Sequence, residues 1–102
     1  MNKILIEKLK KGEVVTSRRK GNSMTPIIHS GDLLEISPIE LEDVKKGDVV
    51  FCRVRKSVFC HLVTAVDEIK LRFQIGNNHG HVNGWTKAIY GKITKVNDRE
   101  LK

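Results

Sequence analysis

Ser23 and His61 are the residues whose types could together perform nucleophilic chemistry. A serine hydroxyl is a weak nucleophile at neutral pH unless a base within hydrogen-bond reach takes its proton. A histidine with an ordinary pKa of about 6.5 is largely neutral at pH 7 and can be that base. Because Ser23 lies between Gly21 and Pro26, a flexible and a rigid residue, we expect an exposed turn whose hydroxyl faces a cleft and whose backbone N–H groups receive an oxyanion.

Both residues also have an ordinary structural interpretation. Ser23 could bond its own backbone within a turn, and His61 could be a half-buried strand residue whose ring is satisfied beside apolar neighbours. Three further histidines compete for the role of base: His29, in the turn after the serine, and His79 and His81, in a loop that contains glycine.

The segment around Ser23 carries a family resemblance. Residues 21–26 read Gly-Asn-Ser-Met-Thr-Pro, and residues 30–32 read Ser-Gly-Asp before an apolar strand. This stretch resembles the Gly-x-Ser-Met-x-Pro box of the signal peptidase I and LexA families, in which the serine is the nucleophile and a Gly-Asp turn starts the next strand. The resemblance implies that Ser23 is the nucleophile and Met24 its companion.

Three further blocks resemble the same families in the same order. Residues 45–51 resemble a Lys-Gly-Asp-Val-Val strand, and residues 75–78 with residues 89–93 resemble a Gly-Asp-Asn box and a closing Ile-x-Gly-x-Val strand. The block at residues 60–63 resembles the segment that supplies the general base, which is lysine in most bacterial enzymes and histidine in the archaeal and endoplasmic-reticulum type. The resemblance therefore implies that His61 is the base.

The resemblance covers residues 12–96 and is closest to short, soluble, often phage-associated relatives without a membrane anchor or DNA-binding domain. It implies a serine endopeptidase acting on a peptide or protein that is added as an extended chain along a strand edge. Self-cleaving relatives cut an Ala-Gly or Cys-Gly bond, which this sequence lacks, so we expect cleavage of another protein.

The sequence departs from the family pattern at the third catalytic position. Enzymes of the histidine type have an aspartate after the Gly-Asp-Asn box, but no aspartate lies between Asp67 and Asp98 here. Asn83 falls closest to that position, and its amide could orient an imidazole while stabilising its charged form less than a carboxylate would. We expect Asn78 or Asn83 to position the site. An inactive β module that binds a peptide, a protein or nucleic acid is the alternative.

We expect no cofactor and no metal ion. His79 and His81 are two residues apart and could share one face of an extended segment with His61. No carboxylate or thiolate with ligand spacing accompanies them, so a metal site is not favoured.

The elements that must position these residues form a mainly β chain. Apolar residues at helical spacing predict a short helix within residues 1–12, ended near Gly12. Short β-branched runs between turn residues predict coiled β-sheets of the LexA and signal peptidase type, in one domain spanning residues 1–102. The predicted strands are residues 13–17, 33–38, 48–55, 58–66, 71–75 and 88–96, with turns at 30–32, 46–48 and 83–84.

Charge and cysteine content limit the remaining function classes. The net charge of +7 would attract anionic partners, but only residues 18–20 and residues 53–56 form dense basic groups, so a nucleic-acid site is possible without being favoured. Cys52 and Cys60 lack zinc-site spacing, and they predict reduced thiols or, if the strand register allows it, a cross-strand disulfide. No apolar run approaches a membrane span, so we expect a soluble, cytoplasmic protein.

Overall fold

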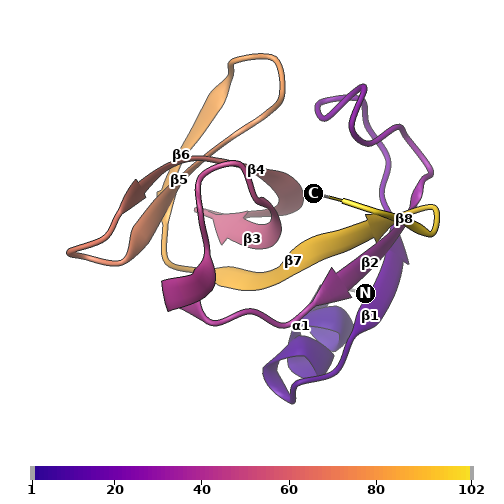
Figure 1. The fold of residues 1–102 in the computed structure, drawn as a ribbon, viewed down its shortest axis with the longest axis horizontal. Helices are drawn as coiled ribbons and strands as arrows, with labels where there is room; N and C mark the ends of the chain where they lie inside the picture. Colours follow the sequence, from indigo (N-terminus) through magenta and orange to yellow (C-terminus); the bar gives the residue numbers. More distant parts are fainter. Residues whose placement is uncertain (1, 102) are drawn as a thin grey trace.

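The computed structural model describes residues 2–101 and contains one antiparallel sheet of eight strands with a short N-terminal helix (Figure 1). The prediction of a mainly β fold with one short helix at the N-terminal end is confirmed. The elements are α1 (Asn2–Lys10), β1 (Val15–Arg18), β2 (Leu33–Ser37), a 3-10 turn η1 (Leu41–Asp43), β3 (Val49–Val54), β4 (Ser57–Asp67), β5 (Arg72–Gly76), β6 (Val82–Thr86), β7 (Ile89–Val96) and β8 (Arg99–Glu100). None of the helices in this part of the chain is long and apolar enough to cross a membrane.

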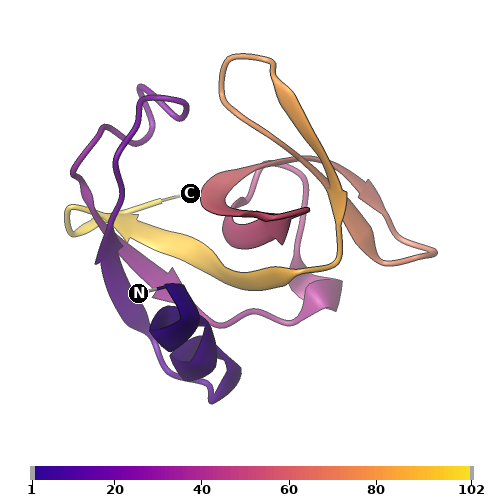
Figure 2. The ribbon, with the colours of Figure 1, turned by 180° about the vertical axis from the view of Figure 1, so that it is seen from behind.

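The order of the strands places β3 and β7 in the middle of the sheet. The order is β1-β2-β7-β3-β4-β5-β6, and β8 pairs with β7. Register shifts between Glu35 and Ile36 and between Val63 and Ala65 bend the sheet, as β-bulges do. Helix α1 packs beside β1 and β7, and the long β1–β2 connection and the β5–β6 loop rise on the same side of the molecule (Figures 1 and 2).

Strand β4 changes its pairing partner half-way along. Residues 57–62 pair with β3, whereas residues 62–67 pair with β5. In the described sheet, the first half of β4 therefore pairs with a strand on one edge only. His61 lies in this half, opposite Val50.

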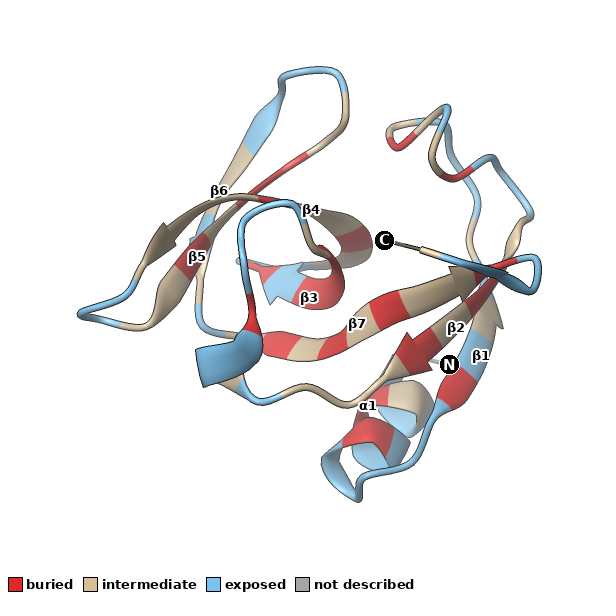
Figure 3. Ribbon diagram, viewed as in Figure 1, coloured by how far each residue is buried: buried red, intermediate tan, exposed pale blue. Residues whose placement is uncertain are grey.

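Strand β3 is buried on both faces, which explains its nearly continuous apolar sequence (Figure 3). Val49 and Phe51 belong to a core beneath α1 and β1, whereas Val50 and Cys52 belong to a second core with Phe73. Because side chains alternate along a strand, one strand contributes to both cores. The strand that bears His61 is therefore paired with the most deeply buried strand of the sheet.

The predicted turn at residues 83–84 is wrong. Asn83 and Gly84 lie inside β6, where Gly84 pairs with Ile75 and adopts a φ of 141°. The Asn-Gly pair favours a turn locally, but pairing with β5 makes it a strand with an irregular register. The predicted strands accordingly do not include β6, β8 or the 3-10 turn η1.

The two cysteines are free and buried, and the strand register excludes the disulfide that the sequence left open. Cys52 pairs with Phe59 and Cys60 pairs with Phe51, so the two thiols occupy neighbouring positions of the register. Directly opposite residues share one face of a sheet, and adjacent positions face opposite sides. Cys52 and Cys60 therefore belong to different cores.

Candidate active site

The turn that bears Ser23 is anchored by its apolar neighbours. Met24 and Ile28 are 4% and 6% exposed and pack into the core beneath α1, and the N–H of Ile28 donates to the carbonyl oxygen of Met24 at 2.9 Å. Ser23 itself is half-buried. The buried methionine therefore fixes the turn while the neighbouring serine stays accessible from one side.

His61 is held by its strand and by an aromatic neighbour. Its pairing with Val50 fixes the backbone. The ring of Phe59, two residues earlier on the same face of β4, stacks on the imidazole with centroids 4.2 Å apart and an interplanar angle of 14°. This stacking blocks movement of the imidazole toward the Phe59 ring and covers one of its faces.

Three side chains from separate parts of the chain form one line of hydrogen bonds. The Oγ of Ser23 lies 2.9 Å from Nε2 of His61, and Oδ1 of Asn83 lies 2.8 Å from Nδ1 of the same ring. Because an amide oxygen only accepts hydrogen bonds, Nδ1 carries the proton in this arrangement. The neutral ring then presents the lone pair of Nε2 to the hydroxyl of Ser23.

Burial keeps this imidazole neutral. Removal from water lowers the pKa of His61 below its ordinary value, and the positive charge that His81 can carry lowers it further. The hydrogen bond to Asn83 raises the pKa and opposes the effect of burial in part. At neutral pH the ring is therefore in the form that accepts a proton.

The β5–β6 loop is bonded to the turn of Ser23. The N–H of Asn78 donates to the carbonyl oxygen of Ser23 at 3.1 Å, and Nδ2 of Asn78 donates to that of Thr25 at 3.0 Å. The hydroxyl of Thr25 lies 3.1 Å from Nε2 of His79. The same hairpin thus orients the histidine through Asn83 and holds the serine turn through Asn78.

A glycine shapes the base of this loop. A Cβ on Gly76 would lie 2.5 Å from the backbone oxygen of His81, so no side chain fits without movement of the loop. The neighbouring Asn77 closes the loop, since its Oδ1 accepts from the N–H groups of His79 and His81 at 2.8 and 3.0 Å. The position of Asn78 therefore depends on both Gly76 and Asn77.

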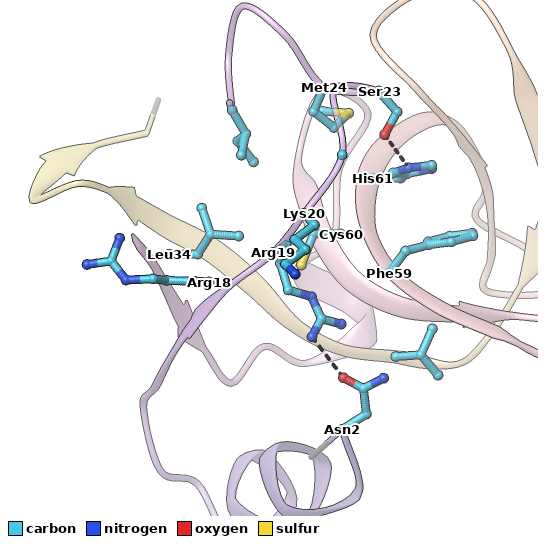
Figure 4. A pocket seen from close by; sticks show the side chains of 13 residues that line it. Asn2, Arg18, Arg19, Lys20, Ser23, Met24, Leu34, Phe59, Cys60 and His61 are labelled. Atoms are coloured by element: carbon cyan, nitrogen blue, oxygen red, sulfur yellow. Dashed lines mark hydrogen bonds between the residues drawn. The ribbon is translucent and has the colours of Figure 1, made fainter. Parts of the chain in front are cut away.

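A cleft of about 350 Å³ opens beside the Ser23–His61 pair (Figure 4). One wall is β4, from Val58 to His61, and the facing wall is the end of β1 with the residues that follow it. The lining residues are Asn2, Arg18, Arg19, Lys20, Gly21, Ser23, Met24, Ile28, Leu34, Val58, Phe59, Cys60 and His61. The pair thus lies at a hollow that can receive a ligand.

Comparison with known proteins matches residues 3–85 to the family described as Peptidase S24-like. The chain belongs to this family. No curated protein and no solved structure matches it significantly. The resemblance to LexA and signal peptidases is therefore confirmed at the level of the superfamily.

The structure brings together three of the five residues singled out from the sequence. His61 is in direct contact with both Ser23 and Asn83. Asn78 bonds the backbone of the serine turn, and Met24 is a buried anchor. Asn78 and Asn83 of this S24-like chain therefore contact different parts of the site.

The other histidines are placed differently. His29 is exposed, and His79 contacts Thr25. His81 influences the pKa of His61. Within residues 2–101, no three His, Cys, Asp or Glu side chains gather as a metal site would require.

Sequence reasoning missed Phe59 and Thr25. Phe59 was detectable in principle, since residues two apart on a strand share a face and Phe59 precedes His61 by two. The bond between Thr25 and the β5–β6 loop joins residues 53 or more positions apart. No local pattern in the sequence indicates such a contact.

Proposed function

We propose that the protein is a serine endopeptidase with Ser23 as nucleophile and His61 as general base. The observation that carries the proposal is the line from Ser23 through His61 to Asn83, with contacts of 2.9 and 2.8 Å. This is the arrangement of nucleophile, base and orienting group that activates a hydroxyl. Membership of the S24-like family supports a peptide or protein as the substrate.

In the proposed mechanism, Oγ of Ser23 attacks the carbonyl carbon of a peptide bond while Nε2 of His61 takes the hydroxyl proton. The resulting imidazolium donates this proton to the leaving amine as the C–N bond breaks, which leaves an acyl-enzyme on Ser23. Water then attacks the ester with His61 again as base, so the acid product leaves and the serine recovers its proton. Asn83 holds Nδ1–H throughout and keeps Nε2 directed at the reaction.

The open edge of β4 supports binding of the substrate as an extended chain. Val58, Phe59, Cys60 and His61 are consecutive residues that all line the cleft, as expected where a ligand lies against the edge of a strand rather than against one face. This edge is the one that pairs with no strand in the described sheet. A peptide here would pass directly beside the hydroxyl of Ser23.

The test is covalent labelling with a small fluorophosphonate, followed by intact-mass measurement. The wild-type protein is expected to gain one adduct, and Ser23→Ala and His61→Ala are expected to gain none. His29→Ala is the matched control, because it removes an exposed histidine outside the line of hydrogen bonds and should label like the wild type. Circular dichroism establishes that each variant is folded.

A non-catalytic binding module is the second candidate, because Asn83 stands where a carboxylate would stabilise the imidazolium. Such a module would bind a peptide, a protein or nucleic acid, but only the peptidase predicts an activated serine. A folded wild-type protein that gains no adduct would favour the module and contradict the peptidase.

A further inference from the structure

The cleft beside Ser23 has one strongly basic wall. Arg18, Arg19 and Lys20 follow one another along it, with the guanidinium of Arg18 donating to the carbonyl oxygen of Gly31 at 2.7 Å, and none of the thirteen lining residues is an aspartate or glutamate. The neighbouring hollow on the other side of Phe59 is lined by Arg55 and His81 and also contains no carboxylate. The surroundings of the serine–histidine pair are therefore cationic, without acidic groups in either lining.

Arg19 is the best defined of these cations. Its side chain is half-buried, and one guanidinium nitrogen donates to Oδ1 of Asn2 at 2.9 Å (Figure 4). The guanidinium carbon lies 5.0 Å from the centroid of the Phe51 ring. These contacts hold the group in place through a neutral amide and a π face. They leave its positive charge without a neutralising partner.

The ion pairs in residues 2–101 lie elsewhere. They join Arg72 to Asp67, Lys92 to Asp48 and Lys95 to Glu35. A guanidinium presents five donors in a planar fork that suits a carboxylate. Arg19 uses one of its nitrogens for Asn2 and also lies beside the Cys60 thiol, which leaves further guanidinium donors for an anion at the wall of the cleft.

We propose that this basic wall selects peptides with an aspartate or glutamate close to the bond that Ser23 attacks, and that Arg19 is the main determinant. This inference rests on the proposed function and names its substrate class. Residues 58–61 line the opposite wall, and an extended chain advances roughly 3.3 Å per residue. A peptide along this wall therefore presents up to about three neighbouring side chains to the basic residues.

A peptide fits the site better than a nucleic acid does. Arg18, Arg19 and Lys20 border a narrow cleft whose other wall is an open strand edge, and strand edges recognise peptide backbone. Recognition of single-stranded nucleic acid usually combines basic residues with exposed aromatic rings for stacking bases. The aromatic ring in this lining, Phe59, is already stacked on His61.

The experiment measures binding to Ser23→Ala, which leaves any bound peptide intact. Three pools of rhodamine-labelled octapeptides have Glu, Gln or Lys fixed at a central position and mixed residues elsewhere, and binding is followed by fluorescence anisotropy. The Glu pool is expected to bind about threefold or more tightly than the Gln pool, since a partly exposed ion pair contributes modestly. Glu and Gln have nearly the same shape, so the comparison isolates charge.

Two second-site variants separate the cleft from the general charge of the protein. Arg19→Gln in the Ser23→Ala background should remove the preference for Glu. Lys46→Gln, which removes an exposed lysine outside the cleft, should retain it.

Equal binding of the Glu and Gln pools would overturn the inference. It would also be overturned if Arg19→Gln and Lys46→Gln weakened the preference for the Glu pool equally. Tighter binding of labelled oligothymidine than of the Glu pool, lost with Arg19→Gln, would assign the wall to nucleic acid instead. Fluorophosphonate labelling of the wild type reports the proposed function independently. A labelled serine without a preference for Glu therefore refutes the acidic selectivity alone.

Discussion

The amide oxygen of Asn83 lies 2.8 Å from Nδ1 of His61, on the side of the ring opposite Ser23. An amide there fixes the same tautomer that a carboxylate would fix, because both groups accept the Nδ1 proton. In the proposed mechanism it contributes no negative charge to stabilise the imidazolium that would form when Ser23 loses its proton. Asn83 therefore orients the ring without the charge that a carboxylate would supply, and this difference can be measured.

Asn83→Asp should increase the reactivity of Ser23. A carboxylate at this position accepts the same proton and stabilises the charged ring, so we expect labelling by a fluorophosphonate to accelerate roughly tenfold or more. The pKa of His61 should rise at the same time, which NMR titration of the ring protons would measure.

Asn83→Leu is the control for shape, since it fills a similar volume and accepts no hydrogen bond. It should lower the labelling rate below that of the wild type. If Asn83→Asp reacts more slowly than the wild type while the protein remains folded, Asn83 does not occupy the orienting position that we assign to it.

The pH dependence of labelling follows from the lowered pKa of His61. Burial disfavours the charged ring, and only the neutral ring can accept the proton of Ser23. The rate should therefore be small at low pH, rise through an inflection below about 6.5, and stay level above it. A rate profile measured between pH 4.5 and 8.5 tests this, and an inflection above the ordinary histidine value would show that another group stabilises the imidazolium.

The predictable part of the fold is the part that local patterns determine. The six predicted strands all occur, because Gly, Asp and Pro residues clearly separate the β-branched runs along this chain. Strand β6 was missed because Asn83 and Gly84 favour a turn locally, and only pairing with β5 makes them a strand. Whether Cys52 and Cys60 could form a disulfide also depended on the register of β3 and β4. Their spacing in the sequence does not reveal that the register is offset by one residue.

The candidate site was predictable to a similar extent. Ser23 and His61 are 38 positions apart, and the ordered family blocks, rather than any local signal, indicated that they meet. The place of Asn83 was indicated by the order of the blocks, but its contact with the ring needs the β5–β6 pairing. The roles of Asn78 and Thr25 depend on two loops meeting in space, which no periodicity describes.

Asn78→Asp should loosen the turn that carries Ser23. A carboxylate cannot donate to the carbonyl oxygen of Thr25, which Nδ2 of Asn78 now does at 3.0 Å. We expect the free energy of unfolding in urea to fall by about 1 kcal/mol, with a slower labelling of Ser23. Asn97→Asp is a useful comparison. It alters a hydrogen-bonded asparagine that directly follows β7, outside the serine turn and the β5–β6 loop, and should leave the labelling rate unchanged. Equal labelling rates in Asn78→Asp and wild type would contradict a positioning role.

Phe51→Ala should destabilise the protein strongly. The ring is fully buried on β3, contacts the core beneath α1, and lies under the guanidinium of Arg19. Truncation of a buried phenylalanine costs about 3–5 kcal/mol, a large part of the roughly 5–15 kcal/mol of a typical domain. Urea unfolding would measure the loss, with Val14→Ala as control because Val14 is 57% exposed. A loss below about 1 kcal/mol would show that the core beneath α1 contributes little to stability.

Cys52 and Cys60 should be unreactive in the folded protein. Burial raises the pKa of Cys60 to about 11 although the Arg19 guanidinium favours the thiolate, and burial raises the pKa of Cys52 further. Since the thiolate is the reactive form, an aromatic disulfide reagent at pH 8 should modify neither residue before urea is added and both afterwards. Cys60 lines the cleft, so rapid reaction of one thiol, abolished by Cys60→Ser, would show that the cleft opens further than its present lining allows. An inert Cys60 would leave the hydroxyl of Ser23 as the candidate nucleophile in the lining of the cleft.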